Sequence, residues 1–149
     1  MRIFKAPEAI EINSEKSIFL AGTIDKGSSV NWQEEAIKFF HTTPYNIFNP
    51  RRDDWDNSWE QKIDDEKFNE QVNWELTAME KADLIIMNFL PYSQSPVTLL
   101  EFGLFAKTNK LMVCCPDEFW RSGNIHIICN RYGVPLFKTM NVLLLNIRL

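Results

Sequence analysis

Short apolar runs recur along the chain, and the segments between them carry apolar residues at every third or fourth position. An apolar run of roughly four to eight residues is typical of a strand buried on both faces of a parallel sheet. The runs that fit this description cover residues 17–21, 45–50, 83–89, 110–116 and 134–138. Residues 3–12 show a weaker strand pattern interrupted by Pro7, and we expect an edge strand or an arm there.

The segments between the runs carry helix signals. Asn31, followed three residues later by Glu34, is a capping-box-like start. Ser95 is a good N-cap, and Pro96 is well placed at the first helical position. The predicted helices cover residues 31–42, 68–82, 95–108, 125–131 and 140–149, and residues 51–67 form a long charged and aromatic loop.

Strand and helix therefore alternate through the whole chain. This alternation favours a parallel sheet with helices on both faces, joined by right-handed crossovers. The sequence predicts one α/β domain over residues 1–149, a flavodoxin-like or Rossmann-like three-layer sandwich with about five parallel strands.

One acidic residue stands in the most apolar of the predicted helices. Glu101 lies among Val97, Leu99, Leu100, Phe102 and Leu104, which cover most of that helix and predict that it is largely buried. A buried carboxylate is costly unless something pairs with it or uses it. The helix also follows the carboxyl end of a strand, where open α/β sheets bind ligands. The alternative is a glutamate that faces solvent or pairs with Lys107.

Composition narrows the class of protein. A net charge of −4 gives no electrostatic reason to expect a nucleic acid or an anionic membrane as partner. The cysteines are odd in number, and two of them, Cys114 and Cys115, stand in an apolar run, which favours free thiols in the reducing cytoplasm. Neither a signal peptide nor a membrane span is recognisable, no residues have metal-ligand spacing, and no cofactor is expected.

The loops that follow successive parallel strands should meet at one edge of the sheet. Here they carry carboxylates, amides, arginines and aromatic rings at residues 22–25, 49–53, 88–95 and 116–124. The dinucleotide, P-loop and serine-hydrolase fingerprints are missing from the sequence. Two carboxylates beside one pocket suit a displacement at a sugar carbon, in which one attacks the anomeric centre and the other protonates the leaving group.

Several segments together resemble the nucleoside 2-deoxyribosyltransferase-like family over about residues 18–133. The segments are Gly22-Thr-Ile-Asp25, Asn49-Pro-Arg-Arg52, Trp74-Glu75, Ala82-Asp83, Ser95-Pro-Val-Thr-Leu-Leu-Glu-Phe-Gly103 and Cys115-Pro116 with Phe119-Trp-Arg-Ser-Gly-Asn124. The resemblance implies a flavodoxin-like fold and an enzyme that moves 2-deoxyribose between nucleobases through a covalent glycosyl-glutamate. It also implies a homo-oligomer that acts on a small-molecule 2'-deoxynucleoside and a nucleobase.

The family pattern assigns the two catalytic carboxylates. Glu101, with Gly103 after it, matches the nucleophile, and Glu75, 26 residues earlier, matches the acid/base group, which is usually an aspartate in the transferases. Ser95 stands where the transferases have an aspartate for the sugar hydroxyl. A serine there resembles the deoxynucleoside 5'-monophosphate N-glycosidases, whose serines contact the 5'-phosphate. The choice between nucleoside and 5'-monophosphate, and between transfer and hydrolysis, therefore stays open, as does a non-catalytic nucleotide-binding module.

The resemblance also suggests the substrate contacts. Asp25 and Asn124 would hold sugar hydroxyls or the base edge, with Asn124 supplied by a neighbouring subunit, and Trp55 or Phe119 would stack on the base. The remaining predicted binding residues are Gly22, Thr23, Asn49, Asn88, Arg51 and Arg52, the arginines as readers of a base carbonyl or a 5'-phosphate. Each has a structural alternative: a turn cap for Asp25, a helix N-cap for Asn124, a subunit contact for Trp55, a solvated charge cluster for the arginines beside Asp53 and Asp54, and a surface charge for Glu75.

Overall fold

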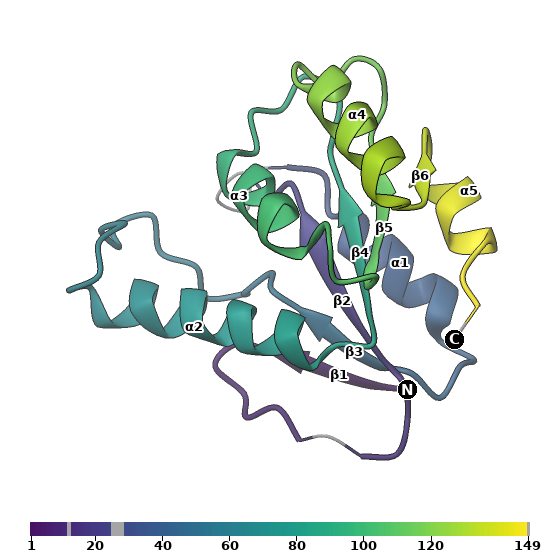
Figure 1. Cartoon of the computed structure of the whole chain (residues 1–149). Helices are drawn as coiled ribbons and strands as arrows, with labels where there is room; N and C mark the ends of the chain where they lie inside the picture. The colour runs from purple at the N-terminus through teal and green to yellow at the C-terminus, as the bar shows by residue number, and fades with distance from the viewer. Residues whose placement is uncertain (12, 25–28, 149) are drawn as a thin grey trace.

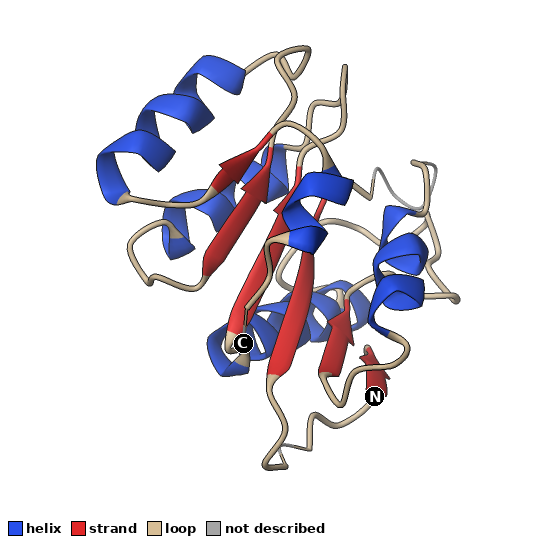
Figure 2. Ribbon diagram, turned by 90° about the vertical axis from the view of Figure 1, so that its right-hand side faces the viewer, coloured by secondary structure: helices blue, strands red, loops and turns tan. Residues whose placement is uncertain are grey.

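The computed structural model describes residues 1–11, 13–24 and 29–148. Its centre is a six-stranded sheet in the order β1-β3-β2-β4-β5-β6, in which every neighbouring pair is parallel. Figure 2 shows the strand arrows pointing the same way. The strands are β1 (Arg2–Lys5), β2 (Ser17–Gly22), β3 (Asn46–Asn49), β4 (Leu84–Asn88), β5 (Leu111–Cys114) and β6 (Leu136–Phe137).

Five of these strands confirm the predicted flavodoxin-like order. Leaving β1 aside, the second strand in the chain lies at one edge and the first lies between it and the third, as a doubly wound sheet requires. The sixth strand is β1, which extends the sheet beyond β3 with Phe4 paired to Phe48. The weak strand pattern at the start of the chain therefore includes a true edge strand, which adds a sixth strand to the expected five.

Helices cover both faces of the sheet (Figure 1). Because side chains alternate along a strand, Phe19 and Ile85 face the layer formed by α2, α3 and α4, whereas Ile18 and Ile86 face α1 and α5. The two apolar cores define the three layers of the predicted sandwich. The helices are α1 (Trp32–Phe40), α2 (Glu66–Lys81), α3 (Pro96–Phe105), α4 (Ser122–Tyr132) and α5 (Met140–Leu145).

The helix starts show which local signals were correct. Asn31 caps α1 by accepting a hydrogen bond from the Glu34 backbone N–H, as predicted. Asp65 caps α2 in the same way, so this helix begins at Glu66, two residues before the predicted start. Ser95 does occupy the N-cap of α3, but it has a left-handed backbone (φ 46°) and its side chain makes no capping hydrogen bond.

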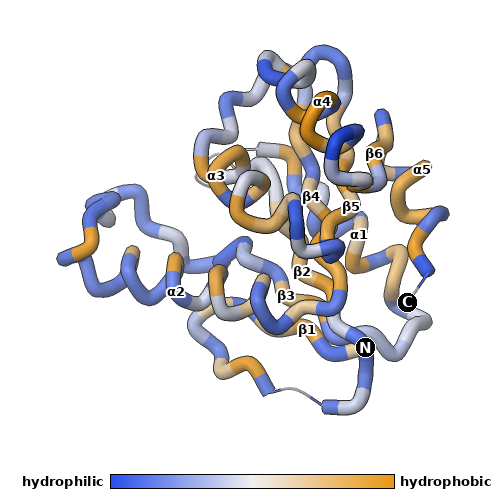
Figure 3. Tube along the Cα trace, viewed as in Figure 1, coloured by the Kyte–Doolittle hydropathy of each residue, from blue (hydrophilic) through white to orange (hydrophobic). Residues whose placement is uncertain are grey.

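The prediction that α3 is largely buried was wrong. The helix packs on the sheet through Thr98, Glu101, Phe102 and Phe105, which follow the spacing of one helix face. Its opposite face exposes Val97, Leu100 and Leu104, with exposed fractions of 59%, 66% and 57%. Figure 3 shows α3 as a mainly apolar helix at the surface. Apolar residues lie on every side of α3, but only the side that packs against the sheet is buried.

Gly22 sets how closely β2 and β4 approach at the carboxyl edge of the sheet. Its φ is +140°, and a Cβ at this position would lie 2.3 Å from the Asn88 carbonyl oxygen. Neither the backbone conformation nor the space admits a side chain. The two strands therefore meet directly beneath the loops that follow them.

Two further findings concern the whole of the described chain. Cys114, Cys115 and Cys129 are free and buried. None of the helices described is long and apolar enough to cross a membrane.

Candidate active site

A cleft of about 490 Å³ opens at the carboxyl edge of the sheet, between the loops after β2 and β3 and the helices α2 and α3. Its volume is within the range of roughly 300–1,000 Å³ that is usual for small-molecule sites. The residues that line it are Phe19, Ala21, Gly22, Thr23, Ile24, Pro50, Arg51, Arg52, Trp55, Gln61, Phe68, Gln71, Val72, Glu75, Ser95, Pro96, Val97, Thr98 and Glu101. Both predicted catalytic carboxylates and six of the ten predicted binding residues are among them.

Glu101 comes to the cleft from the second turn of α3. It is only 9% exposed and makes no hydrogen bond or ion pair within the described part of the chain, so it does not pair with Lys107. Burial raises the pKa of Glu101 to about 8, and the nearby Glu75 carboxylate adds to the rise. The side chain is the costly buried carboxylate that the sequence indicated.

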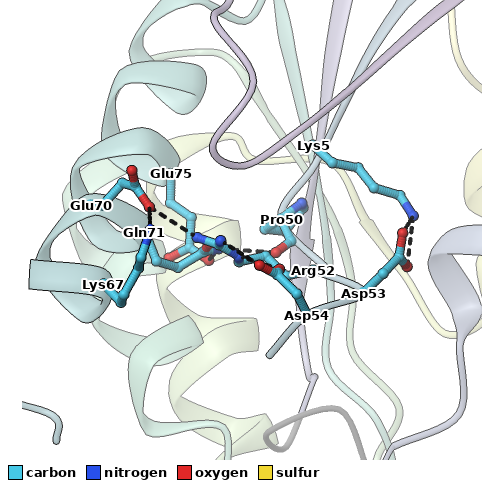
Figure 4. Close-up of polar contacts among 9 residues, drawn as sticks. All are labelled: Lys5, Pro50, Arg52, Asp53, Asp54, Lys67, Glu70, Gln71 and Glu75. Carbon is cyan, nitrogen blue, oxygen red and sulfur yellow. Dashed lines mark hydrogen bonds and ion pairs between the residues drawn. The ribbon is translucent and has the colours of Figure 1, made fainter. Parts of the chain in front are cut away.

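Glu75 comes to the same cleft from the middle of α2. Its Oε1 accepts a hydrogen bond from Gln71 Nε2 at 2.8 Å (Figure 4). Burial raises the pKa of Glu75 to about 7, and the hydrogen bond from Gln71 acts in the opposite direction. Because Glu75 and Glu101 repel each other, the pair favours a state that holds one proton near neutral pH.

Hydroxyl groups gather where α3 begins. Ser95 Oγ lies 2.6 Å from Thr23 Oγ1 and 2.9 Å from Ser93 Oγ. Thr23 Oγ1 also accepts a hydrogen bond from the Leu90 backbone N–H. Ser95 is thus turned away from its own helix and into a hydroxyl cluster formed by Thr23, Ser93 and Ser95, which explains why its side chain does not cap α3.

The two arginines are held by the protein. Arg52, with a side chain only 1% exposed, is bound through Nε and Nη2 to Asp54 at 2.8 and 2.9 Å and through Nη1 to Glu70 at 3.4 Å (Figure 4). Arg51 donates from Nη2 to the Ser29 carbonyl at 3.0 Å. The alternative of a solvated charge cluster does not hold for Arg52, because its guanidinium is buried and ties the loop after β3 to α2.

Aromatic rings lie at one side of the cleft. Trp55 lines it and packs against Trp59 with ring centroids 5.1 Å apart, and the Arg52 guanidinium lies 5.0 Å from the Trp59 ring. Phe119, the other ring expected to stack on a base, is 1% exposed and packs against Phe89 in the core. Of the two, only Trp55 is in a position to meet a ligand in the cleft.

Three predicted binding residues that the structure describes do not line the cleft. Asn88 is buried in β4, and Asn49 Oδ1 accepts a hydrogen bond from the Arg51 backbone N–H, so both shape the backbone beneath the loops. Asn124 lies exposed in the first turn of α4, whose N-cap is Arg121. Asp25 lies outside the described residues.

The sequence interpretation missed several residues of the cleft, of which Gln71 has the most polar contacts. It stands one turn before Glu75 on α2, and residues four apart share a helix face, so the position of Glu75 was a signal that could have found it. Val72 and Thr98, three residues before Glu75 and Glu101, share their helix faces in the same way, and Phe68 lies two turns before Glu75. No group of three or more His, Cys, Asp or Glu side chains able to hold a metal is present within residues 1–11, 13–24 and 29–148.

The buried carboxylates make a prediction about stability. The pKa of Glu101 is about 8 in the fold, against 4.5 for an ordinary glutamate, so the folded state binds this proton more tightly and stability falls as pH rises from about 4.5 to 8. We expect Glu101→Gln to raise the free energy of unfolding by about 5 kcal/mol at pH 8.5 and to change it little at pH 4.5. Thermal unfolding at the two pH values tests this, with exposed Glu80→Gln as control. An equal effect of Glu101→Gln at both pH values would contradict it.

An α/β domain with one buried and one partly buried carboxylate that repel each other at the carboxyl edge of its sheet has the arrangement of an enzyme that breaks a glycosidic bond. Comparison with known families agrees. The family described as nucleoside 2-deoxyribosyltransferase like matches residues 15–119, more than two thirds of the chain, and the protein belongs to this family. The match includes Glu75 and Glu101 but ends before Asn124. No curated protein sequence matched the chain.

Proposed function

We propose that the protein is a nucleoside 2-deoxyribosyltransferase that moves 2-deoxyribose between nucleobases through a covalent intermediate on Glu101. The observation that carries the proposal is the meeting of Glu101 and Glu75 in one cleft from two different helices. Family membership over residues 15–119 supports it. Free buried cysteines support a reducing cytoplasmic setting, in which the reaction would serve nucleoside salvage.

In the first half of the reaction, a carboxylate oxygen of Glu101 attacks C1' of the sugar. The C1'–N bond breaks, and its electron pair stays on the base nitrogen. Glu75 in its protonated form gives its proton to the departing base, so that the base leaves neutral. The reacting form is the one-proton state in which Glu101 is ionised and Glu75 is protonated. Because Glu101 has the higher pKa of the two in the free protein, the proton has to pass from Glu101 to Glu75 when the substrate binds.

In the second half, a nitrogen of the incoming base attacks C1' and the bond between C1' and Glu101 breaks. Glu75, now a carboxylate, takes the proton from the incoming base. Transfer requires that water does not reach the intermediate first. The apolar cleft residues Phe19, Phe68 and Val72 support exclusion of water, and Trp55 is placed to stack on the base.

A second candidate is hydrolysis of 2'-deoxynucleoside 5'-monophosphates by the same pair of carboxylates. The observation that favours it is the hydroxyl cluster of Thr23, Ser93 and Ser95 beside the N-terminus of α3. Hydroxyl groups and free backbone N–H groups at a helix start suit a phosphate. In this reading water takes the place of the incoming base.

One chromatographic experiment separates the two. The protein is incubated with deoxyadenosine or deoxyinosine, with and without free cytosine or adenine, and again with the corresponding 5'-monophosphates. A new nucleoside that forms only when acceptor base is present supports the transferase. Free base released equally without an acceptor, above all from the monophosphates, supports the hydrolase. An absence of turnover on every substrate would overturn both and favour a binding module.

We also propose that the protein works as a homo-oligomer in which Asn124 reaches the cleft of a neighbouring subunit. Asn124 is exposed and does not line the cleft of its own chain. The exposed apolar face of α3, formed by Val97, Leu100 and Leu104, supports a contact between copies.

Mixing two inactive variants tests the shared site. If Asn124 acts across the interface, Glu101→Ala and Asn124→Ala chains refolded together should regain roughly a quarter of the sites in a dimer, because mixed pairs rebuild one complete site. Activity that does not return on mixing, or a monomer in sedimentation analysis, would contradict the proposal. The Asn141→Ala variant, changed at an exposed asparagine of α5, serves as the control in the same mixture.

A further inference from the structure

Gln71 is buried in the wall of the cleft and is only 3% exposed. Its Nε2 donates to the Pro50 carbonyl at 3.0 Å and to Glu75 Oε1 at 2.8 Å, as the dashed lines in Figure 4 show. A side-chain amide nitrogen carries two hydrogens. Both are therefore committed, one to the loop after β3 and one to the predicted acid/base residue.

The two acceptors fix the orientation of the Gln71 amide. A reversed amide would set Gln71 Oε1 against the Pro50 carbonyl, which can only accept a hydrogen bond, whatever the protonation state of Glu75. In the orientation observed, Gln71 Oε1 is buried and has no partner within the described part of the chain. A buried acceptor without a donor is destabilising. Gln71 thus makes its two hydrogen bonds through Nε2 although Oε1 is left without a partner.

This arrangement distinguishes the two oxygens of Glu75. Because Gln71 donates to Oε1, a proton on Oε1 would lower the acceptor strength of that oxygen and weaken the hydrogen bond, so the proton is favoured on Oε2. Oε2 has no hydrogen-bond partner in residues 1–11, 13–24 and 29–148, and the Glu75 side chain lines the cleft. Oε2 is thus the oxygen that remains for a bound molecule.

We propose that Gln71 is a positioning residue: held by Pro50, it occupies Oε1 of Glu75 and so assigns the transferable proton to Oε2, from which the leaving base receives it. The inference rests on the proposed function. When Glu75 is protonated, its O–H bond points from Oε2 into the cleft, and when it is a carboxylate, Gln71 stabilises the negative charge from behind. One amide thus serves both halves of the reaction.

The electrostatic surroundings of Glu75 leave this role to Gln71. The other charged groups that line the cleft in the described residues are Glu101 from α3 and Arg51 and Arg52 from the loop after β3. Arg52 is already bound to Asp54 and Glu70. Gln71 is the only group of the described chain that makes a hydrogen bond to Glu75.

The test compares two buried glutamines. Gln71→Met removes the donor at similar side-chain volume, and Gln33→Met is a matched control. Gln33 on α1 is fully buried, neither of its polar atoms has a hydrogen-bond partner among the described residues, and it does not line the cleft. The first readout is a titration of ¹³C-labelled glutamate carboxyls by NMR, with the Glu75 signal assigned by its loss in Glu75→Gln. We expect the pKa of Glu75 to rise by about one unit in Gln71→Met and to stay unchanged in Gln33→Met.

The second readout is the pH dependence of turnover. We expect the alkaline limb of kcat/KM to move to higher pH in Gln71→Met, because Glu75 keeps its proton longer, and kcat to fall about tenfold, because Oε2 is no longer held in place. Gln71→Leu provides a second form of the same change should the methionine variant fail to fold.

The outcomes separate the inference from the function on which it rests. Normal turnover with an unchanged Glu75 titration in Gln71→Met, or a shift shared by Gln33→Met, would overturn the role of Gln71 alone. A titration shift in a protein that turns over no 2'-deoxynucleoside or monophosphate would overturn the proposed function and, with it, the catalytic role of the hydrogen bond.

Discussion

Glu101→Ala is expected to abolish base exchange, with a loss of at least about 10⁴-fold in kcat. The reason is that, in the proposed mechanism, Glu101 supplies the oxygen that bonds to C1', and a methyl group cannot replace it. Water in the vacated space could still attack, but without a carboxylate it would be a poor nucleophile. The measurement is the rate of new-nucleoside formation from deoxyinosine and adenine, followed by chromatography.

The variant also provides a direct view of the intermediate. Wild-type protein incubated with a 2'-deoxynucleoside and no acceptor should gain the mass of one deoxyribosyl group, and Glu101→Ala should not. Exposed Glu80→Gln is the control for loss of a glutamate, because Glu80 does not line the cleft. Base exchange by Glu101→Ala within tenfold of the wild-type rate would contradict a nucleophilic role for this residue.

Glu75→Gln is expected to lower kcat by about 10²–10⁴-fold on natural nucleosides, and the size of the loss should depend on the leaving group. A purine needs a proton in order to leave, whereas 4-nitrophenolate does not. We therefore expect a 4-nitrophenyl 2-deoxyriboside to lose less than about tenfold in the first half of the reaction. Release of 4-nitrophenol, followed by absorbance, makes the comparison.

The pH profile gives an independent check on Glu75. Its pKa of about 7 and that of Glu101 of about 8 place the one-proton state between pH 7 and pH 8, so wild-type kcat/KM should be highest there. Removing one of the two titrating groups should take one limb of the profile away. An equal loss on both leaving groups, with both limbs retained, would show that Glu75 is not the proton donor.

The fold was predictable because its signals are local and repeated. The strands are runs of apolar residues bounded by turns. Asn31 caps the start of α1 with its side chain, and Gly133 ends α4 with a left-handed backbone (φ 66°) that few other residues adopt. What the sequence could not provide was which side of an apolar helix faces the sheet. Residues Val97 and Leu100 are as apolar as Phe102, and only the packing of α3 against one face of the sheet separates them.

The candidate site was predictable to the extent that it follows from the topology. Glu75 and Glu101 are far apart in the sequence, yet both lie on helices beside the carboxyl edge of a parallel sheet, where the order of the strands brings them together. The contacts of neutral side chains were not predictable. Gln71 resembles any polar helix residue until Pro50 is seen beside it, and Ser95 resembles an ordinary N-cap until Thr23 is seen within 2.6 Å.

Gly22 has a consequence for how relatives of this protein are compared. Its lack of a side chain is required by the Asn88 carbonyl of the adjoining strand, whichever molecule occupies the cleft. If relatives keep a glycine at this position, the reason is therefore the close spacing of two strands. Relatives that have lost the carboxylates of the cleft would be expected to keep it as well. Evolutionary evidence for activity has to come from positions such as Glu75 and Glu101, whose side chains the fold would be more stable without.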